Sequence, residues 1–290
     1  MPQFVIRPLG IDEVSVPVDW AAAEGWNPGV SDVGPFWHQD PQGFLGGFLD
    51  GTMIACISAV RYDATFGFVG FYIVAPGWRG QGYGIQMWDA ALAHLADVRT
   101  VGLDGVVDQQ SNYRKSGFAL AYRSVRYAGL AAPGYHPDVQ DNARGLRLVP
   151  AAETALDSLV RYDAEHFGAE RTQFVRDWIA APGHHGIVAE TSGSRIAGYG
   201  VIRPCRDGYK VGPLFADDSE IAAHLLSALL ATVTPGSPVF LDPPVPNAAA
   251  VEMVSRLGWR PIFETARMYR GDPLQLPVNE LFGVTTFELG

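Results

Sequence analysis

The sequence predicts an α/β (α+β) fold of two tandem domains, each a mixed, mostly antiparallel sheet flanked by helices. Three observations support this prediction. The 290 residues favour two domains, since a domain typically has about 100–200 residues. Strand-like and helix-like patterns alternate up to Tyr127 and begin again at Leu146 in the same order. Residues 130–145 between them are rich in turn formers and lack apolar periodicity, so we place the domains at 1–129 and 146–290, with a linker at 130–145.

The elements of the first half follow from local patterns. Asp50-Gly51 between two β-rich runs predicts a tight hairpin, and apolar residues at helical spacing predict the helix at Ile85–Leu95. The expected strands are Phe4–Arg7, Gly43–Leu49, Thr52–Tyr62, Phe66–Val74, Val101–Val107 and Leu120–Tyr127. The expected helices are Val18–Gly25, a segment capped by Ser31 or Asp32 that ends at His38, Ile85–Leu95 and Gln109–Ser116.

The second half repeats this order. Its expected strands are Leu146–Val149, Gly186–Ala189, Ile196–Arg203, Tyr209–Leu214, Val239–Leu241 and Ile262–Arg270. Its expected helices are Ala152–His166, Arg171–Ala180, Ser219–Thr232 and Asn247–Leu257. The strand-like tail Pro277–Gly290 is expected to pack back onto the body.

The halves also share a local signature. Gly117-Phe118 is followed by Arg126-Tyr127 in the first half, and Gly258-Trp259 by Arg267-Met268-Tyr269 in the second. An internal duplication explains both the repeated order and this signature.

Composition and charge exclude several classes of protein. A formal net charge of −10 has the wrong sign for general nucleic-acid binding. The apolar runs Met53–Val60 and Ile221–Val233 are too short or too interrupted to span a bilayer, so no membrane association is expected. Cys56 and Cys205 lie far apart, and the start of the chain lacks signal-peptide features, which indicates a cytoplasmic protein with reduced thiols. We expect a monomer or a homodimer.

A glycine-rich loop carries the clearest chemical signal. Gly77, Gly80, Gly82 and Gly84 stand between the apolar strand Phe66–Val74 and the amphipathic helix Ile85–Leu95. Exposed backbone N–H groups at a helix N-terminus stabilise an anion such as a pyrophosphate, and glycine lets it approach closely.

Three nucleotide sites could use such a loop. A P-loop is excluded because its glycine spacing and Lys-Ser/Thr pair are missing. A dinucleotide fingerprint needs Gly-x-Gly-x-x-Gly, which the loop lacks, although Asp104 stands about 20 residues on, where a ribose-binding acid would lie. A plain turn without a ligand is a further interpretation. The third possible site is a coenzyme A loop. Arg79, Gly82 and Gly84 closely match the Arg/Gln-x-x-Gly-x-Gly/Ala signature of the GNAT N-acetyltransferase superfamily. The chain therefore resembles this superfamily.

The resemblance implies the residues of an acetyl-CoA site. It includes Asn112-Tyr113-Arg114-Lys115-Ser116-Gly117-Phe118, which is similar to the family's Tyr-x-Lys-x-Gly-Phe segment. The implied roles are pyrophosphate binding by the loop, pantetheine binding by the preceding strand with backbone donors near Ile73 and Val74, and protonation of the leaving thiolate by Tyr113. A tyrosine that only packs on a helix is the alternative for Tyr113. The expected cofactor-binding residues are Ile73, Val74, Arg79, Gly80, Gln81, Gly82, Tyr83, Gly84, Asn112 and Tyr113.

The general base is less clearly marked. The family often places a glutamate on the pantetheine-binding strand, and Phe71–Val74 has none. We predict that Asp104, on the neighbouring strand, accepts the ammonium proton directly or through water, a strand-end cap being its alternative role. Glu24 and Asp40 are weaker candidates from the region that would cover the acceptor. No residue spacing predicts a metal site.

The second half lacks the glycine loop and the tyrosine of such a site. Asp217, Asp218 and Glu220 occupy the position of the pyrophosphate loop and would repel a diphosphate, and Val254 replaces the tyrosine. The resemblance is therefore to tandem GNAT proteins with a degenerate C-terminal domain, including the kasugamycin 2′-N-acetyltransferase type.

This resemblance predicts direct acetyl transfer from acetyl-CoA to a primary amine of a small molecule, with an aminoglycoside-type amino sugar such as kasugamycin as the first acceptor and antibiotic resistance as the role. The alternatives are a non-catalytic acyl-CoA-binding or ligand-sensing protein and an NAD-dependent enzyme.

Overall fold

The computed structural model describes residues 3–131 and 145–290. Most of the predicted linker 130–145 lies outside the described residues. The first half contains β1 (Phe4–Pro8), α1 (Ser15–Ala23), α2 (Val33–Gln39), β2 (Phe44–Leu49), β3 (Thr52–Arg61), β4 (Phe66–Val74), α3 (Tyr83–His94), β5 (Thr100–Val106), α4 (Gln110–Lys115) and β6 (Ala119–Leu130). The second contains β7 (Arg147–Pro150), α5 (Leu156–Phe167), α6 (Thr172–Ala180), β8 (His185–Glu190), β9 (Ile196–Pro204), β10 (Tyr209–Ala216), α7 (Ser219–Leu230), β11 (Pro238–Leu241), α8 (Ala248–Arg256), β12 (Arg260–Arg270) and β13 (Leu281–Gly283).

The predicted order of elements is confirmed, with bounds that differ by a few residues. The segment predicted to open a helix at Ala152 is instead a 3-10 turn at Ala151–Glu153, and α5 begins at Leu156. Asp32 precedes α2 but does not cap it. Its carboxylate accepts a hydrogen bond from the backbone N–H of Gly29 at 2.8 Å and pairs with Arg203 at 3.0 Å, so Asp32 joins the two halves.

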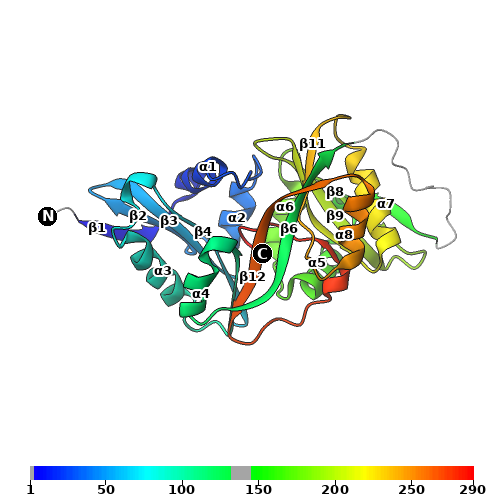
Figure 1. The fold of residues 1–290 in the computed structure, drawn as a ribbon. Coiled ribbons are helices and arrows are strands. Elements are labelled where there is room, and N and C mark those ends of the chain that lie inside the picture. Colours follow the sequence, from blue (N-terminus) through cyan, green and yellow to red (C-terminus); the bar gives the residue numbers. More distant parts are fainter. Residues whose placement is uncertain (1–2, 132–144) are drawn as a thin grey trace.

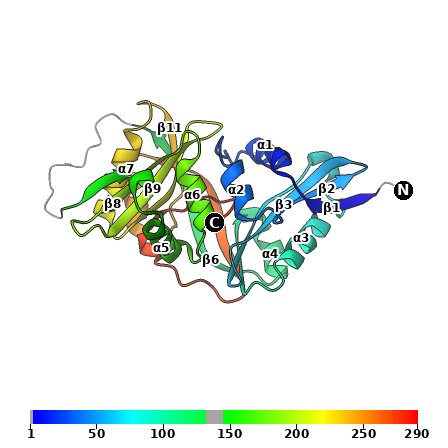
Figure 2. The same ribbon diagram turned by 180° about the vertical axis from the view of Figure 1, so that it is seen from behind.

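The described strands form one continuous sheet across the molecule in the order β1-β2-β3-β4-β5-β12-β6-β11-β10-β9-β8-β7, and β13 pairs with β10 (Figure 1). The pairs β4–β5 and β10–β11 are parallel, whereas the others are antiparallel. Helices flank the sheet in each half (Figure 2). The predicted fold class is confirmed, and the parallel pair recurs at the same place in both halves.

The two halves exchange one strand each. β6, predicted as the closing strand of the first half, pairs with β11 of the second half, and β12 of the second half pairs with β5 of the first. β6 and β12 also pair with each other at the centre of the sheet, where Figure 1 shows them running side by side. Each half therefore completes its sheet with a strand from the other.

Two buried ion pairs fasten the exchanged strands. Arg126 on β6 makes a bidentate contact with Asp242, directly after β11, at 2.8 and 2.7 Å. Arg267 on β12 makes the same contact with Asp104 on β5 at 2.9 and 2.7 Å. Both arginines stand nine residues after the glycine of the repeated signature. The duplication signature thus marks a pair of equivalent contacts between the halves.

The C-terminal tail closes the second half. β10 and β11 pair only at Tyr209–Val211 and then diverge, and β13 pairs with β10 in the space that opens. The backbone N–H of Val284 donates to the carbonyl of Asp242 at 3.1 Å on the other side. The predicted return of the tail to the body is confirmed, and the tail fills the gap between the two strands.

We predict that Arg126→Ala destabilises the fold by about 3–5 kcal/mol, because it leaves the buried Asp242 carboxylate unpaired. The measurement is a urea unfolding curve. Arg256→Ala is the control, since Arg256 forms an exposed ion pair with Glu252 on α8, and its unfolding midpoint should stay close to that of the wild type. Equal midpoints for both variants would contradict the importance of the Arg126–Asp242 pair.

Candidate functional site

The site begins where β4 leaves β5. The two strands pair only from Phe66–Thr100 to Val69–Leu103, so the β5-facing edge of Gly70–Val74 has no strand partner among the described residues. β4 has a bulge opposite β3 at this point, and Phe71 adopts a positive φ of 46°. Such a bulge redirects the backbone of a strand. Of the two predicted backbone donors, Val74 lies in this segment with its N–H alternate to that of Ile73, whereas the backbone N–H of Ile73 is directed at the Cys56 thiol on β3.

The glycine loop follows β4 and leads into α3. Gly80 and Gly82 have φ values of 75° and 85°, and a Cβ at either position would meet open space. Glycine is therefore needed for the backbone conformation rather than for packing. Gly84 differs, because its Cβ would lie 2.8 Å from the Tyr72 hydroxyl. The loop presents its backbone to solvent at the N-terminus of α3, as an anion site requires.

Arg79 connects this loop to the first helix. Its Nε donates to the carbonyl of Val74 at 2.8 Å, and its guanidinium forms an ion pair with Glu24. Glu24 thus lies beside the loop, and a phosphate bound to Arg79 would compete with its carboxylate.

A cavity of about 480 Å³ extends from the loop along the free edge of β4. Both halves line it, because β12 and the C-terminal tail form its far wall. Of the predicted residues, Glu24, Ile73, Val74, Arg79, Gly80, Gly84, Asp104 and Tyr113 line it. Sequence reasoning missed the other polar and aromatic lining residues, which include Trp26, Gln109, Phe263, Thr265, Phe287 and Glu288.

Tyr113 reaches this cavity from α4. Its ring packs against Trp88 with centroids 5.4 Å apart, and it lies over Gly105, where a Cβ would be 2.5 Å from its Cε2 atom. Burial, with a smaller contribution from Tyr72, raises the pKa of Tyr113 to about 12. The phenol therefore keeps its proton at neutral pH.

Asp104 lines the cavity but is held in an ion pair. Both of its carboxylate oxygens accept from Arg267, and the side chains of both residues are buried. Burial raises the pKa of Asp104, and Arg267 opposes that rise. The equivalent aspartate of the second half, Asp242, makes the same pair, and that half lacks the glycine loop. Asp104 as the base stays a prediction, which the ion pair disfavours.

The remaining predicted residues lie at the margin of the cavity or away from it. Gln81, Gly82 and Tyr83 belong to the adjoining loop and helix start, and the Gln81 amide donates to the carbonyl of Gly77. Asn112 is exposed on α4 and contacts Gln109 and Lys115. Asp40 does not line the cavity. It accepts hydrogen bonds from the backbone of Arg61 and from His94, which suits a structural role.

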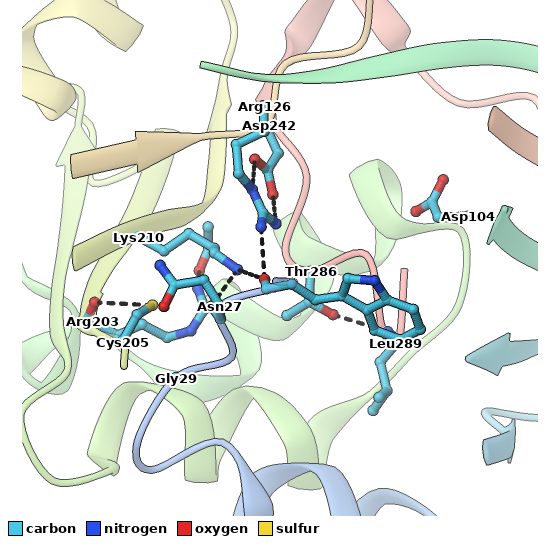
Figure 3. A network of polar contacts seen from close by, with 12 residues as sticks. Asn27, Gly29, Asp104, Arg126, Arg203, Cys205, Lys210, Asp242, Thr286 and Leu289 are labelled. Atoms are coloured by element: carbon cyan, nitrogen blue, oxygen red, sulfur yellow. Dashed lines mark hydrogen bonds and ion pairs between the residues drawn. The ribbon is translucent and has the colours of Figure 1, made fainter. Parts of the chain in front are cut away.

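The loop that carries Trp26 is fixed by cations of both halves (Figure 3). Arg126 donates to the carbonyl of Trp26 at 2.7 Å, and Lys210 on β10 donates to the carbonyl of Asn27 at 2.9 Å. The Asn27 side chain exchanges two hydrogen bonds of 2.9 Å with the backbone of Asp207. These contacts hold Trp26 at the wall of the cavity.

Glu288 is the unexpected polar residue of the site. Its side chain comes from the C-terminal tail, it is 3% exposed, and neither carboxylate oxygen has a hydrogen-bond partner in the part of the chain that the structure describes. The tail Pro277–Gly290 has two charged side chains in the sequence, Glu280 and Glu288, and no local pattern distinguishes Glu288 as a site residue. Nothing local indicated that this tail reaches the other half.

In the second half, the segment equivalent to the glycine loop has a different structure. Asp218 caps α7 by accepting from the backbone N–H groups of Glu220 and Ile221 at 3.0 Å, and Asp217 pairs with Arg195. The chain's own tail occupies the gap between β10 and β11. That this half does not bind coenzyme A stays a prediction.

Among the described residues, no group of three or more His, Cys, Asp and Glu side chains is arranged to hold a metal ion. None of the described helices combines the length and apolar character needed to cross a membrane.

Comparison with solved structures shows the same fold. An acetyltransferase structure from Pyrococcus horikoshii, described as putative, matches 99% of this chain and 96% of its own with a TM-score of 0.82 at 19% identity. A tandem GNAT protein from the clavulanic acid biosynthesis pathway matches 93% of this chain and all of its own with a TM-score of 0.64 at 16% identity.

Sequence comparison identifies the family. Residues 15–118 match the acetyltransferase (GNAT) family, and residues 159–283 match an acetyltransferase (GNAT) domain. The holothin acyltransferase of Pseudoalteromonas sp. (strain SANK 73390) is 33% identical over 284 residues, 98% of this chain and 94% of the relative. An uncharacterized N-acetyltransferase, YitH, of Bacillus subtilis (strain 168) is 21% identical over 83% of both chains. The chain belongs to the GNAT acetyltransferase superfamily, with two GNAT domains in tandem.

Proposed function

We propose that the first half binds one acyl-CoA between β4 and β5 and transfers its acyl group directly to a primary amine of a small molecule. The observation that carries this proposal is the single cavity that joins the glycine loop, the free edge of β4 and Tyr113. The pyrophosphate would bind the loop amides from Gly80 to Gly84, and the pantetheine arm would pair with Gly70–Val74. The backbone N–H group of Val74 would polarise the thioester carbonyl.

Tyr113 is the proposed general acid. Amine attack on the thioester breaks the C–S bond, and the departing thiolate needs a proton. A buried phenol that stays protonated at neutral pH can supply it, provided that the sulfur lies within hydrogen-bond reach.

The acceptor is proposed from the walls of the cavity and from the relatives. The holothin acyltransferase indicates a small-molecule amine, and the sequence resemblance suggested an amino sugar such as kasugamycin. Trp26 of the first half and Phe263 and Phe287 of the far wall give the cavity an aromatic surface, which favours a compact, partly apolar amine. We therefore propose holothin as the first acceptor to assay and kasugamycin as the second. Acetyl-CoA is the first acyl donor to assay, together with longer acyl-CoAs.

We predict one acetyl-CoA site per chain, measured by calorimetric titration. Gly82→Ala should weaken binding about tenfold, because a side chain at positive φ costs about 1–2 kcal/mol and would shift the loop amides. Gly236→Ala is the matched control, since Gly236 has a φ of 84°, has open space around its Cα and lies in the second half. Two sites per chain, or equal affinity for both variants, would contradict the assignment of the loop.

We predict that Tyr113→Phe lowers kcat by about 10²–10⁴-fold and leaves the acetyl-CoA affinity within about twofold, because only proton transfer is lost. Tyr209→Phe on β10, away from the cavity, should retain the wild-type kcat. Since the pKa of Tyr113 is raised, its ionisation should cause no loss of activity between about pH 7 and about pH 10. Parallel losses of kcat and affinity in Tyr113→Phe would indicate a packing role instead.

A further inference from the structure

A buried carboxylate without a hydrogen bond requires an explanation. Ionised groups are costly to bury unless they are paired, and most buried polar atoms have partners. Both Glu288 oxygens lack one within residues 3–131 and 145–290, although the residue lines the cavity. We infer that Glu288, carried by the tail of the degenerate second half, is the general base that deprotonates the amine acceptor in the first half. This inference rests on the proposed function.

The position of the tail supports this role. Gly70 lies at the start of the free edge of β4, and a Cβ there would overlap the main-chain oxygen of Glu288. The tail therefore passes directly against the strand proposed to hold the thioester. Glu288 and Tyr113 line the same cavity, so a base and an acid face one reaction space.

The tail is held firmly enough to position a catalytic group. Arg171 donates to the Thr285 hydroxyl at 2.8 Å, and the Tyr62 hydroxyl donates to the carbonyl of Leu289 at 2.6 Å. The Thr286 hydroxyl accepts from the backbone N–H of Leu289 at 2.9 Å, which closes a tight turn around Glu288 (Figure 3). Hydrogen bonds thus hold the tail on both sides of Glu288, while neither oxygen of its carboxylate has a hydrogen-bond partner among the described residues.

The charges around Glu288 come from four strands. Arg126 on β6, Arg203 on β9 and Lys210 on β10 interact with it electrostatically, as does Asp104 on β5. The three cations offset the burial of the carboxylate, whereas Asp104 repels it. None of these cations donates a hydrogen bond to it, so its lone pairs remain available to a substrate.

The other carboxylates of the cavity are already bound. Both oxygens of Asp104 accept from Arg267, and Glu24 is paired with Arg79 beside the loop. Glu288 is the acidic lining residue whose basic oxygens have no competing donor among the described residues.

The proton balance is complete with these groups. Glu288 takes one proton from the substrate ammonium, and the neutral amine then attacks the thioester carbonyl carbon. As the tetrahedral intermediate collapses, the C–S bond breaks and Tyr113 protonates the thiolate. The second amine proton restores the tyrosine, and the proton on Glu288 passes to solvent, so the reaction yields an amide, a free thiol and one proton.

The test compares two acceptors by thiol release from acetyl-CoA. One is an alkylamine that is cationic at the assay pH, and the other is an arylamine that is already neutral. Glu288→Gln should lower the rate about 100-fold or more with the alkylamine and only slightly with the arylamine, because only the first needs a base. The remaining alkylamine rate should rise about tenfold per pH unit below the pKa of the amine, as its free-base fraction grows.

Glu280→Gln is the matched control. Glu280 lies in the same tail, is partly exposed, contacts His166 and does not line the cavity, so this variant should keep the wild-type rates. Glu288→Asp keeps the charge but withdraws the carboxylate by one methylene. Its rate with the alkylamine should lie between the rates of Glu288→Gln and the wild type. Acetyl-CoA titration of each variant, expected to give affinities within about twofold, shows that the folded site is retained.

Two results would overturn the inference. Equal alkylamine rates for Glu288→Gln and the wild type would show that Glu288 is not the base. An equal loss with both acceptors would assign it a structural role. A wild-type protein that binds acetyl-CoA but acylates none of the amines would instead contradict the proposed function itself.

Discussion

The two reciprocal arginine–aspartate pairs are the contacts on which the architecture depends. Arg126 to Asp242 and Arg267 to Asp104 each join an exchanged strand to a strand of the other half, and all four side chains are buried. Breaking a buried ion pair by removing one partner costs much stability, but an intact pair stabilises the fold little more than an apolar pair would. Such contacts therefore determine which arrangement of strands forms more than they determine its stability. Here they favour the arrangement in which β6 and β12 cross over, because an unexchanged strand would leave its arginine away from the aspartate it meets in the structure.

The second half has the same frame as the first, but its slot in the sheet is filled by its own chain. In both halves a parallel pair of strands diverges, which opens a slot in the sheet. In the first half the slot is a cavity, and in the second the residues after Glu280 fill it. The tail provides apolar contacts there through Leu281 and Phe282, both nearly fully buried. A groove suited to an extended cofactor arm thus serves equally well for an extended segment of polypeptide, since both can pair with the free strand edge.

Features that depend on residues close together in the sequence were predictable, whereas contacts between residues far apart in the sequence were not. The strand–glycine loop–helix unit and Tyr113 were predictable because glycine spacing, helix periodicity and a short motif act within about 40 residues. The strand exchange was not, because the alternation of apolar residues in β6 is the same whichever strand lies beside it. Asp104 was chosen as the base from its neighbouring strand, yet its partner Arg267 lies far along the chain. Glu288 was overlooked for the same reason, since its place depends on how the tail crosses to the other half.

These features give a physical reason for keeping a half that lacks the glycine loop. It supplies Phe263 and Thr265 from β12, Phe287 and Glu288 from the tail, and the Lys210 contact that fixes the loop of Trp26. Without it, the first half would have no far wall to its cavity, no exchanged strand beside β5 and no partner for Asp104. The lining of the cavity is therefore divided between the halves: one carries the loop, the free strand edge and the tyrosine, and the other carries the far wall, which the proposed function assigns to the acceptor. Substitutions that change the acceptor should accordingly concentrate in the second half and in the Trp26 loop, while those that affect the acyl donor should concentrate near β4 and α3.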